Sequence, residues 1–366
     1  MKKIIVRCLL LILLFLVLSL IMPFSFSAKP RKKNLIYDNV MAEALEGKNP
    51  KVTDIAMLGA HDAFSHNMKL FSKICEHEEG IMASAIAKYI ANGLAVRMSR
   101  AQNASAKEML YAGVRYFDVR ISHSYGEYYT KHIYLSDTLA SYVVEVIDFL
   151  ESHQGEFIIF DIQHFSRGDD ISYSDLNEYL GSIKNDNGKS LYDFVYYNGK
   201  YNTISDLTYN DVTMNGTASG VIILAKTPNY ESFIYRDLED SKKDDTGYYT
   251  IRSLWHNTNS TKEMLDGIEE EYQYLLNNSE LVEGKLVVNQ AQKTALQTNT
   301  SIIKSLFSWS LLDMASSFNS KLIKQENFSR WLEVMPIFMV DNVTSMKGSF
   351  NKLANEKIIE FNKTLK

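Results

Sequence analysis

The sequence contains only two cysteines, Cys8 and Cys75, among 366 residues. Cys8 lies in an N-terminal apolar run that we expect to be separate from the folded part. The folded part then keeps one cysteine and cannot form an internal disulfide. A chain of this length can still bury a core large enough for stability. No metal-binding or nucleophile pattern surrounds Cys75, so we expect it to be a small buried side chain.

Proline is also scarce, with five residues, and the chain has no low-complexity block and no short internal repeat. Proline-rich linkers and repeats are the usual signs of several domains or of a solenoid. Their absence favours one large domain, which we predict at residues 50–366, after a linker and lead-in helix at residues 29–49.

A long apolar run occurs at the N-terminus, where residues 8–22 read CLLLILLFLVLSLIM after a basic start. Ser25 and Ser27 then supply small residues suited to cleavage. This order predicts a signal peptide over residues 1–28 and a secreted or extracellular protein. The alternative is an uncleaved membrane anchor through residues 8–26, which is about long enough to span a bilayer.

Positive charge is in short supply beyond this leader. Residues 1–33 hold seven basic and no acidic residues, so the remainder has 32 Lys and Arg against 44 Asp and Glu, a net charge near −12. Nucleic-acid binding needs a basic surface, and we therefore expect no nucleic-acid partner. Adsorption to anionic lipid by charge is equally unsupported. Action on a membrane lipid would depend on apolar contacts or on positive charge inside the site.

Apolar runs of strand-like composition recur along the chain, and helical patterns separate them. Residues 136–156 have apolar positions at helical spacing, with Ser136 or Asp137 as the expected cap. Continuous apolar strands alternating with helices are typical of a parallel sheet covered on both faces. With seven or eight such units we predict an irregular TIM-type (β/α)8 barrel rather than a doubly wound sheet. The expected strands are residues 54–58, 113–121, 129–134, 156–163, 220–226, 285–290 and 336–341.

Polar and ionisable side chains close or follow these runs. Reactive residues of such barrels lie at the C-terminal ends of the strands, so we expect them to surround one site. They are His61, Asp118, Arg120, His132, Gln163, Lys226, Gln290 and Asp341.

The types of these side chains indicate phosphodiester cleavage by an internal hydroxyl. That reaction needs a base, an acid for the leaving oxygen and a cation for the charge that grows on the phosphate. Histidine suits the first two tasks because its pKa lies near neutrality. Arginine suits the third through its rigid fork of donors.

The same residues lie in segments that resemble the X domain of phosphatidylinositol-specific phospholipases C. The resemblance is to the metal-independent bacterial branch and to the eukaryotic X-domain-only proteins, and that family folds as an irregular barrel. It weakens after about residue 210. The matching segments are MLGAHDAFSH (57–66), AGVRYFDVRISH (112–123), residues 100–120 and 149–165 and, faintly, residues 285–292 and 336–344.

The resemblance implies the acid and base. His61 would be the general base on the inositol 2-hydroxyl, and Asp341 would orient it. His132 would be the general acid toward the diacylglycerol oxygen, with support from Asp62. His123 and His164 compete for the acid role; His132 is preferred because the family places its histidine a few residues before an Asp-Thr-Leu helix start.

The resemblance also implies the phosphate site. Arg120 would clamp the phosphate, although an arginine at a barrel rim can also form only a structural ion pair. Asp118, Gln163, Lys226 and Gln290 are the candidate substrate-binding residues. The expected partner is a phosphatidylinositol-type lipid, or a glycosyl-phosphatidylinositol anchor, at a membrane surface, bound by a monomer. The products would be diacylglycerol and a cyclic inositol phosphate.

We expect no metal or other cofactor. Calcium-dependent members of the family carry Asn after the first histidine and acidic residues in the second block, where this chain has Asp62 and Arg120. An arginine supplies the positive charge of calcium and repels the ion. The EHEE run at residues 76–79 contains side chains that can bind a metal. Adjacent helical residues point in different directions, so we expect a solvated helix face there and not a metal site.

Two segments depart from the family pattern. Ile133 follows His132 where many relatives have glycine, so the loop is expected to close differently. Residues 227–260 form a long polar connection rich in aromatic residues, either a lip over the substrate or buried packing.

Two other functions are open at this point. One is a catalytically silent inositol-lipid-binding protein. Such a protein could lose a histidine freely, so the intact set of His61, Asp62, Arg120 and His132 argues against it. The other is a barrel phosphodiesterase acting on glycerophosphodiesters, which would carry a His-Arg-Gly start and metal carboxylates.

Overall fold

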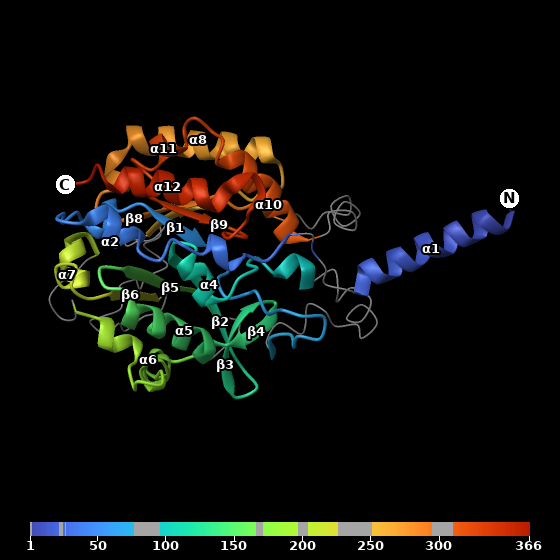
Figure 1. The fold of residues 1–366 in the computed structure, drawn as a ribbon, viewed down its shortest axis with the longest axis horizontal. Coiled ribbons are helices and arrows are strands. Elements are labelled where there is room, and N and C mark those ends of the chain that lie inside the picture. Colours follow the sequence, from blue (N-terminus) through green and yellow to red (C-terminus); the bar gives the residue numbers. More distant parts are fainter. Residues whose placement is uncertain are drawn as a thin grey trace.

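The computed structural model describes residues 2–21, 25, 27–76, 96–165, 171–196, 204–225, 251–294 and 310–366. Nine strands in these ranges form one curled sheet (Figure 1). They are β1 Met57–Ala60, β2 Val114–Ser124, β3 Glu127–His132, β4 Tyr134–Thr138, β5 Phe157–Phe165, β6 Gly220–Ala225, β7 Ile251–Leu254, β8 Leu286–Gln290 and β9 Ile337–Val340.

Helices cover the outside of this sheet. In Figure 1, α8 and α12 lie on one side of the strands and α5 and α6 on the opposite side. The α-helices are α1 Lys2–Ile21, α2 Val40–Leu45, α4 Ala106–Tyr111, α5 Leu139–Ser152, α6 Tyr173–Ser182, α7 Tyr209–Thr213, α8 Thr261–Asn277, α10 Leu311–Leu322, α11 Phe328–Trp331 and α12 Phe350–Asn362. Short 3-10 helices occur at Lys32–Asn34, Val52–Asp54, Leu191–Phe194, Ile204–Asp206, Ser279–Leu281 and Lys347–Ser349.

The parallel strands follow the order β6-β5-β2-β1-β9-β8-β7, so the last strand of the chain pairs with the first. This is a barrel-type order. Among the described residues no pairing joins β6 to β7, so the part of the sheet that the structure describes is a curled, open barrel. The predicted α/β class is confirmed; of the predicted irregular (β/α)8 barrel, the described residues show seven parallel strands and not the closure.

Two strand predictions were wrong. The run at residues 129–134 is not one barrel strand but two antiparallel strands, β3 and β4, which reverse at Ile133 and extend the end of β2. The strand β7 lies inside the segment that the sequence suggested was a connection. Its outward Arg252 is buried against Glu271 of α8, so a charge interrupts the apolar pattern that marks the other strands.

The helix predicted between β4 and β5 is α5. Its N-cap is Thr138, one or two residues later than expected, because Ser136 and Asp137 are still part of β4.

Side chains of the barrel strands alternate between two cores. Tyr116, Ile159 and Met339 pack in the cluster inside the sheet, whereas Phe117 and Phe338 pack against the helices outside. Successive strand residues point to opposite faces, so positions two residues beyond an inner residue are also inner. Polar residues that continue the inner rows therefore meet at the C-terminal mouth of the barrel.

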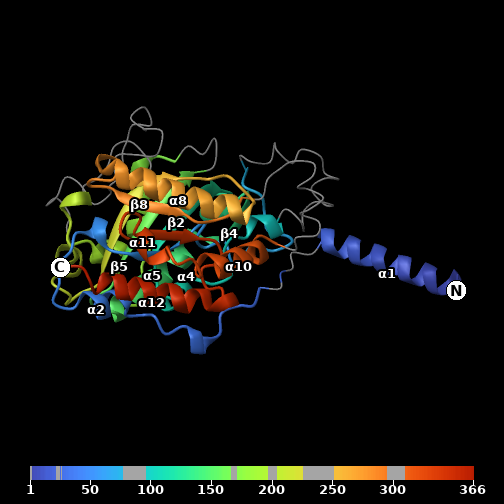
Figure 2. The same cartoon turned by 90° about the horizontal axis from the view of Figure 1, so that it is seen from above.

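The N-terminal helix α1 extends away from the rest of the protein in both views (Figures 1 and 2). Its apolar side chains are exposed; Leu11, for example, is 65% exposed. Of the helices in the described ranges, none meets the combined length and hydropathy needed to cross a membrane. The signal peptide over residues 1–28 stays a prediction.

Candidate active site

His61 and Asp341 become neighbours through the pairing of β1 with β9. Ala60 lies opposite Val340 in the parallel register, so the next residue of each strand shares the barrel mouth. The backbone N–H of His61 donates to the carbonyl of Val340 at 3.1 Å. The His61 ring lies with Nδ1 2.7 Å from Oδ1 of Asp341. A carboxylate at this distance accepts the Nδ1 proton and leaves Nε2 as the reactive nitrogen.

Arg120 lies between His61 and two buried carboxylates. It continues the inner row of β2 after Asp118, which is why both side chains enter the mouth. Its Nη2 is 2.9 Å from His61 Nε2 and 3.6 Å from Asp118 Oδ2. Its Nε forms an ion pair with Asp62. With its side chain 24% exposed, Arg120 can still present N–H donors to a ligand.

The Asp62 carboxylate reaches this cluster through a left-handed turn directly after β1. Asp62 has φ 41° and Phe64 has φ 68°, which are uncommon values for residues with a side chain. The Asp62 N–H donates to Asp118 Oδ2 at 3.1 Å, and Asp62 is 1% exposed. Strained conformations of this kind persist where the surroundings hold them, and they cluster at functional sites.

His132, at the end of β3, joins the same cluster through Asp62. Its Nδ1 lies 2.8 Å from the carbonyl oxygen of Ser99 and 3.1 Å from Oδ2 of Asp62. Nδ1 therefore carries the donated proton, and Nε2 of this partly exposed side chain is the nitrogen available to a substrate. Asp62 thus contacts both Arg120 and His132.

The charges of the cluster set the proton affinity of His61. Burial alone lowers the pKa of His61. The charges of Asp62 and Asp341 and the hydrogen bond that His61 donates to Asp341 outweigh burial and raise this pKa to about 9, while the charge of Arg120 opposes them. Burial raises the pKa of Asp118, against the charges of Arg120 and His61. Burial also raises the pKa of Asp341, against the charge and hydrogen bond of His61.

Two protonation states of His61 follow. The contact between Arg120 Nη2 and His61 Nε2 requires Nε2 to accept, which is the neutral, basic form. Below about pH 9 the imidazolium predominates. Its Nε2–H would then turn toward Oδ2 of Asp62 and Oδ2 of Asp118, which lie 3.8 and 3.9 Å away.

Three donor groups of the cluster are close enough to suit a metal ion. Ligand atoms of His61, Asp62 and Asp118 lie within 4.8 Å of one another. Arg120, however, contacts or pairs with all three, so a cation already neutralises this donor set. Calcium also takes six to eight oxygen ligands, far more than the two carboxylates here supply. The residues do not fit calcium, and metal independence stays a prediction.

Two of the other predicted substrate-binding residues can be placed. Gln290, on the inner row of β8, donates to the Ser253 hydroxyl of β7 at 2.7 Å. Gln163 lies within β5. Lys226 falls outside the described residues, as does most of the run at residues 76–79.

The competing histidines occupy other places. His123 is exposed on the antiparallel end of β2, where its ring packs against Tyr128 with centroids 4.7 Å apart. His164 pairs in register with Arg120 across β2 and β5. His132, by contrast, contacts Asp62.

Gln102 is a residue that the sequence did not single out. Its Nε2 donates to the carbonyls of His61 at 2.7 Å and Val340 at 3.0 Å, and its Oε1 accepts from the N–H of Val343 at 3.1 Å. One buried amide therefore ties together the strand ends that carry His61 and Asp341. Gln102 lies in the segment of residues 100–120, which resembles the family, and this resemblance was the signal in the sequence that could have pointed to it.

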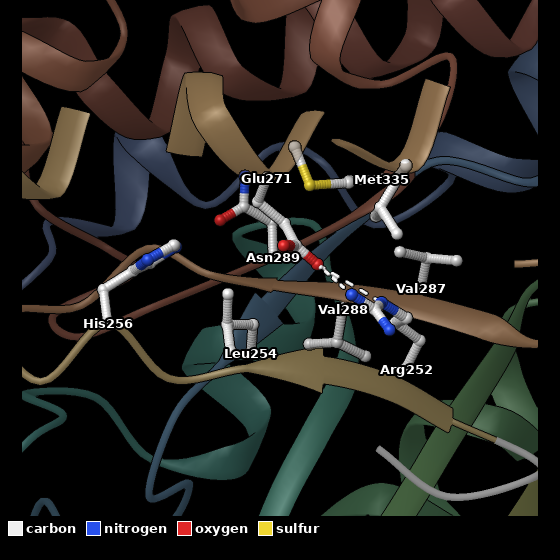
Figure 3. Close-up of a pocket in the computed structure, with 9 residues that line it drawn as sticks. Arg252, Leu254, His256, Glu271, Val287, Val288, Asn289 and Met335 are labelled. Atoms are coloured by element: carbon white, nitrogen blue, oxygen red, sulfur yellow. Dashed lines mark hydrogen bonds and ion pairs between the residues drawn. The ribbon is translucent and has the colours of Figure 1, made fainter. Parts of the chain in front are cut away.

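A small cavity lies elsewhere, between α8 and the outer face of β7 and β8 (Figure 3). Arg252 and Glu271 form a buried ion pair of 2.8 Å on its wall. Burial lowers the pKa of His256, which also lines it. None of the predicted site residues that the structure describes lines this cavity, so we assign it to the packing of α8.

The fold of this chain is similar to that of bacterial phosphatidylinositol-specific phospholipases C. A single-substitution variant of the Staphylococcus aureus enzyme superposes with a TM-score of 0.62 at 14% identity over 93% of this chain and 100% of that chain. The enzyme of Listeria monocytogenes gives a TM-score of 0.57 at 16% identity, over 89% and 98%. At these identities the likeness shows the fold.

Sequence similarity is confined to part of the chain. It is 30% identical over 125 residues to the variant-surface-glycoprotein phospholipase C of Trypanosoma brucei brucei, 31% of this chain and 35% of that protein. It is 28% identical over 129 residues to the human PI-PLC X domain-containing protein 2, 34% of this chain and 42% of that protein. The chain thus spans well under two thirds of these relatives. No protein-family model matches. Over about a third of its length the chain is thus similar in sequence to proteins of the phosphatidylinositol-specific phospholipase C X-domain type, and its fold is similar to that of the bacterial enzymes.

Proposed function

We propose that the protein is a metal-independent phosphodiesterase of the phospholipase C type. It cleaves phosphatidylinositol, or a glycosyl-phosphatidylinositol anchor, to diacylglycerol and a cyclic inositol phosphate. One observation carries the proposal: a candidate base, cation and acid are contiguous, because Arg120 contacts His61 and Asp62 contacts both Arg120 and His132. The name of the trypanosomal relative, a variant-surface-glycoprotein phospholipase C, supports including the anchor as a substrate.

The proposed reaction uses the imidazole rings of both His61 and His132. His61 Nε2 takes the proton of the inositol 2-hydroxyl, and that oxygen forms a new bond to phosphorus. The bond from phosphorus to the glycerol oxygen breaks, and His132 Nε2 gives that oxygen a proton. Asp341 keeps Nδ1 of His61 protonated, and Asp62 stabilises the His132 imidazolium. Arg120 neutralises the charge that develops on the phosphate oxygens.

The substrate class also suggests where the protein acts. A phosphatidylinositol-type lipid is met at a membrane surface, and one solved Staphylococcus aureus enzyme is described by its membrane binding. Secretion with removal of the leader, or retention through residues 8–26, remains part of this proposal.

The test is turnover of phosphatidylinositol vesicles by the full-length chain in excess chelator, followed by phosphorus NMR. We expect cyclic inositol phosphate from the unaltered chain and none from His61→Ala. His123→Ala is the matched control, because it removes an exposed histidine that lies outside the cluster. Absence of turnover, with vesicle binding retained, would instead support the silent lipid-binding function, and activity that chelator abolishes would refute metal independence.

A further inference from the structure

The segment that follows α1 binds the barrel beside the candidate site. The hydroxyl of Ser27 accepts from Asn342 Nδ2 at 2.6 Å and lies 3.0 Å from the hydroxyl of Ser316. The carbonyl of Ser27 accepts from Asn103 Nδ2 at 3.2 Å. Asn342, Ser316 and Asn103 are 1%, 6% and 4% exposed. Ser27 therefore contacts three buried polar side chains from three separate parts of the chain.

Asn342 is the important one of these contacts, because it directly follows Asp341. It adopts the left-handed conformation with φ 44°, and its N–H donates to the carbonyl of Ala101 at 2.7 Å. Asparagine tolerates this conformation better than most residues, yet its surroundings must hold it. The conformation of Asn342 sets the direction in which the chain leaves β9, and hence the position of the preceding carboxylate.

The side-chain amide of Asn342 has two N–H groups, and Ser27 supplies one of its two short contacts. The other is the hydroxyl of Ser316 at 2.7 Å, and the carbonyl of Leu312 is more distant at 3.3 Å. A buried amide N–H without an acceptor is unfavourable. Loss of the Ser27 hydroxyl therefore makes Asn342 reorient or leaves it poorly satisfied.

We propose that Ser27 is a positioning residue that holds Asn342 and, through it, the Asp341 carboxylate against the ring of His61. Its effect on turnover rests on the proposed function, whereas its effect on His61 does not. The predicted signal peptide ends just beyond Ser27, so removal of residues 1–28 would also remove this contact. This contact therefore exists only in a chain that keeps Ser27.

The experiment uses the full-length chain carrying Ser27→Ala, with the intact N-terminus confirmed by mass. NMR of histidine-labelled protein follows the titration of His61, which His61→Gln assigns. We expect the pKa of His61 to fall below that of the unaltered chain, because the Asp341 contact that raises it weakens. On phosphatidylinositol we expect kcat to fall about tenfold or more at an unchanged KM.

Two further variants separate positioning from general destabilisation. Ser27→Thr keeps the hydroxyl and should restore the titration of His61. Ser320 lies on α10, as does Ser316, and its hydroxyl donates to the carbonyl of Ser317 in the same helix. Ser320→Ala should leave the titration of His61 unchanged. A His61 titration unaltered by Ser27→Ala would overturn the inference, as would an equal shift in Ser320→Ala. If the unaltered chain does not turn over phosphatidylinositol, the proposed function fails, and the titration still decides the role of Ser27.

Discussion

At the residue scale, the behaviour of His61 follows from what contacts its two ring nitrogens. Nδ1 faces the Asp341 carboxylate at 2.7 Å, and Nε2 faces the guanidinium of Arg120 at 2.9 Å. The carboxylates raise the proton affinity of the ring, whereas the guanidinium holds Nε2 as an acceptor. A base in this position is strong, and it is available only after it has lost its proton.

This arrangement predicts an alkaline pH optimum. The rate constant kcat/KM reports the free enzyme, so it should rise with pH toward the His61 pKa of about 9. In Asp341→Asn the charge and hydrogen bond that raise this pKa are lost, so the rising limb should move to lower pH. The same variant should lose about a hundredfold or more in kcat, because the ring tautomer is no longer fixed. Asp54→Asn, at an exposed carboxylate, is the control, and a limb that stays in place in Asp341→Asn would contradict the assignment.

A second residue-scale prediction concerns Arg120. Its planar guanidinium contacts His61, Asp62 and Asp118 at once, which a lysine ammonium cannot reproduce. Arg120→Lys should therefore lower kcat/KM by about 100-fold or more in a vesicle assay. Arg330→Lys, at a surface pair with Glu269 that is 42% exposed on the arginine side, should have no measurable effect. Equal activity of the two variants would show that Arg120 has only a structural role.

At the element scale, the β3–β4 hairpin carries His132 into the cluster and reverses at a strained residue. Ile133 has φ 67°, a conformation that a β-branched side chain rarely adopts. Its side chain packs against the small cluster of Met68, Ile74, Val96 and Tyr134. The hairpin thus combines backbone strain with local apolar packing.

A pair of variants separates these two effects. Ile133→Ala and Ile133→Gly both lose the packing, but only glycine adopts the left-handed conformation without strain. We expect the glycine variant to be the more stable of the two by about 1 kcal/mol in denaturant unfolding. A more stable alanine variant would mean that this hairpin is not strained at Ile133.

At the scale of the whole molecule, the mouth of the barrel and its outer wall are stabilised separately. The site cluster lies inside the strands, whereas the Arg252–Glu271 pair lies between the sheet and α8 (Figure 3). Arg252 is 1% exposed, so this pair is buried in the wall of the barrel. Stability and catalysis should therefore respond to different substitutions.

Glu271→Ala tests this separation. It leaves the buried charge of Arg252 without its partner, and should lower the free energy of unfolding by about 3–5 kcal/mol. Glu356→Ala, at a surface pair with Lys352 that is 49% exposed on the glutamate side, should change it by less than about 1 kcal/mol. Activity of the folded fraction should be unchanged in both. An active-site defect in Glu271→Ala at low temperature would show that wall and mouth are coupled.

The sequence by itself determined most of the parallel strands and the set of candidate site residues. Continuous apolar runs mark six of the seven parallel strands, because strands buried on both faces carry apolar residues throughout. The polar residues at their ends could be named in advance, because parallel strands of a barrel deliver their C-terminal residues to one mouth. Strands and strand-end residues could therefore be predicted, because both depend on residues that are neighbours in the sequence.

Only the tertiary structure decided how these parts meet. The strand β7 was missed because a buried partner, Glu271, neutralises its Arg252, and that partner lies in another element. The reversal at Ile133 depends on packing from residues far away in the chain. Gln102 and Ser27 acquire their roles from backbone and side-chain groups that the fold brings to them. Contacts between distant segments have no periodicity in the sequence, because a hydrogen bond depends on geometry that only the folded chain provides.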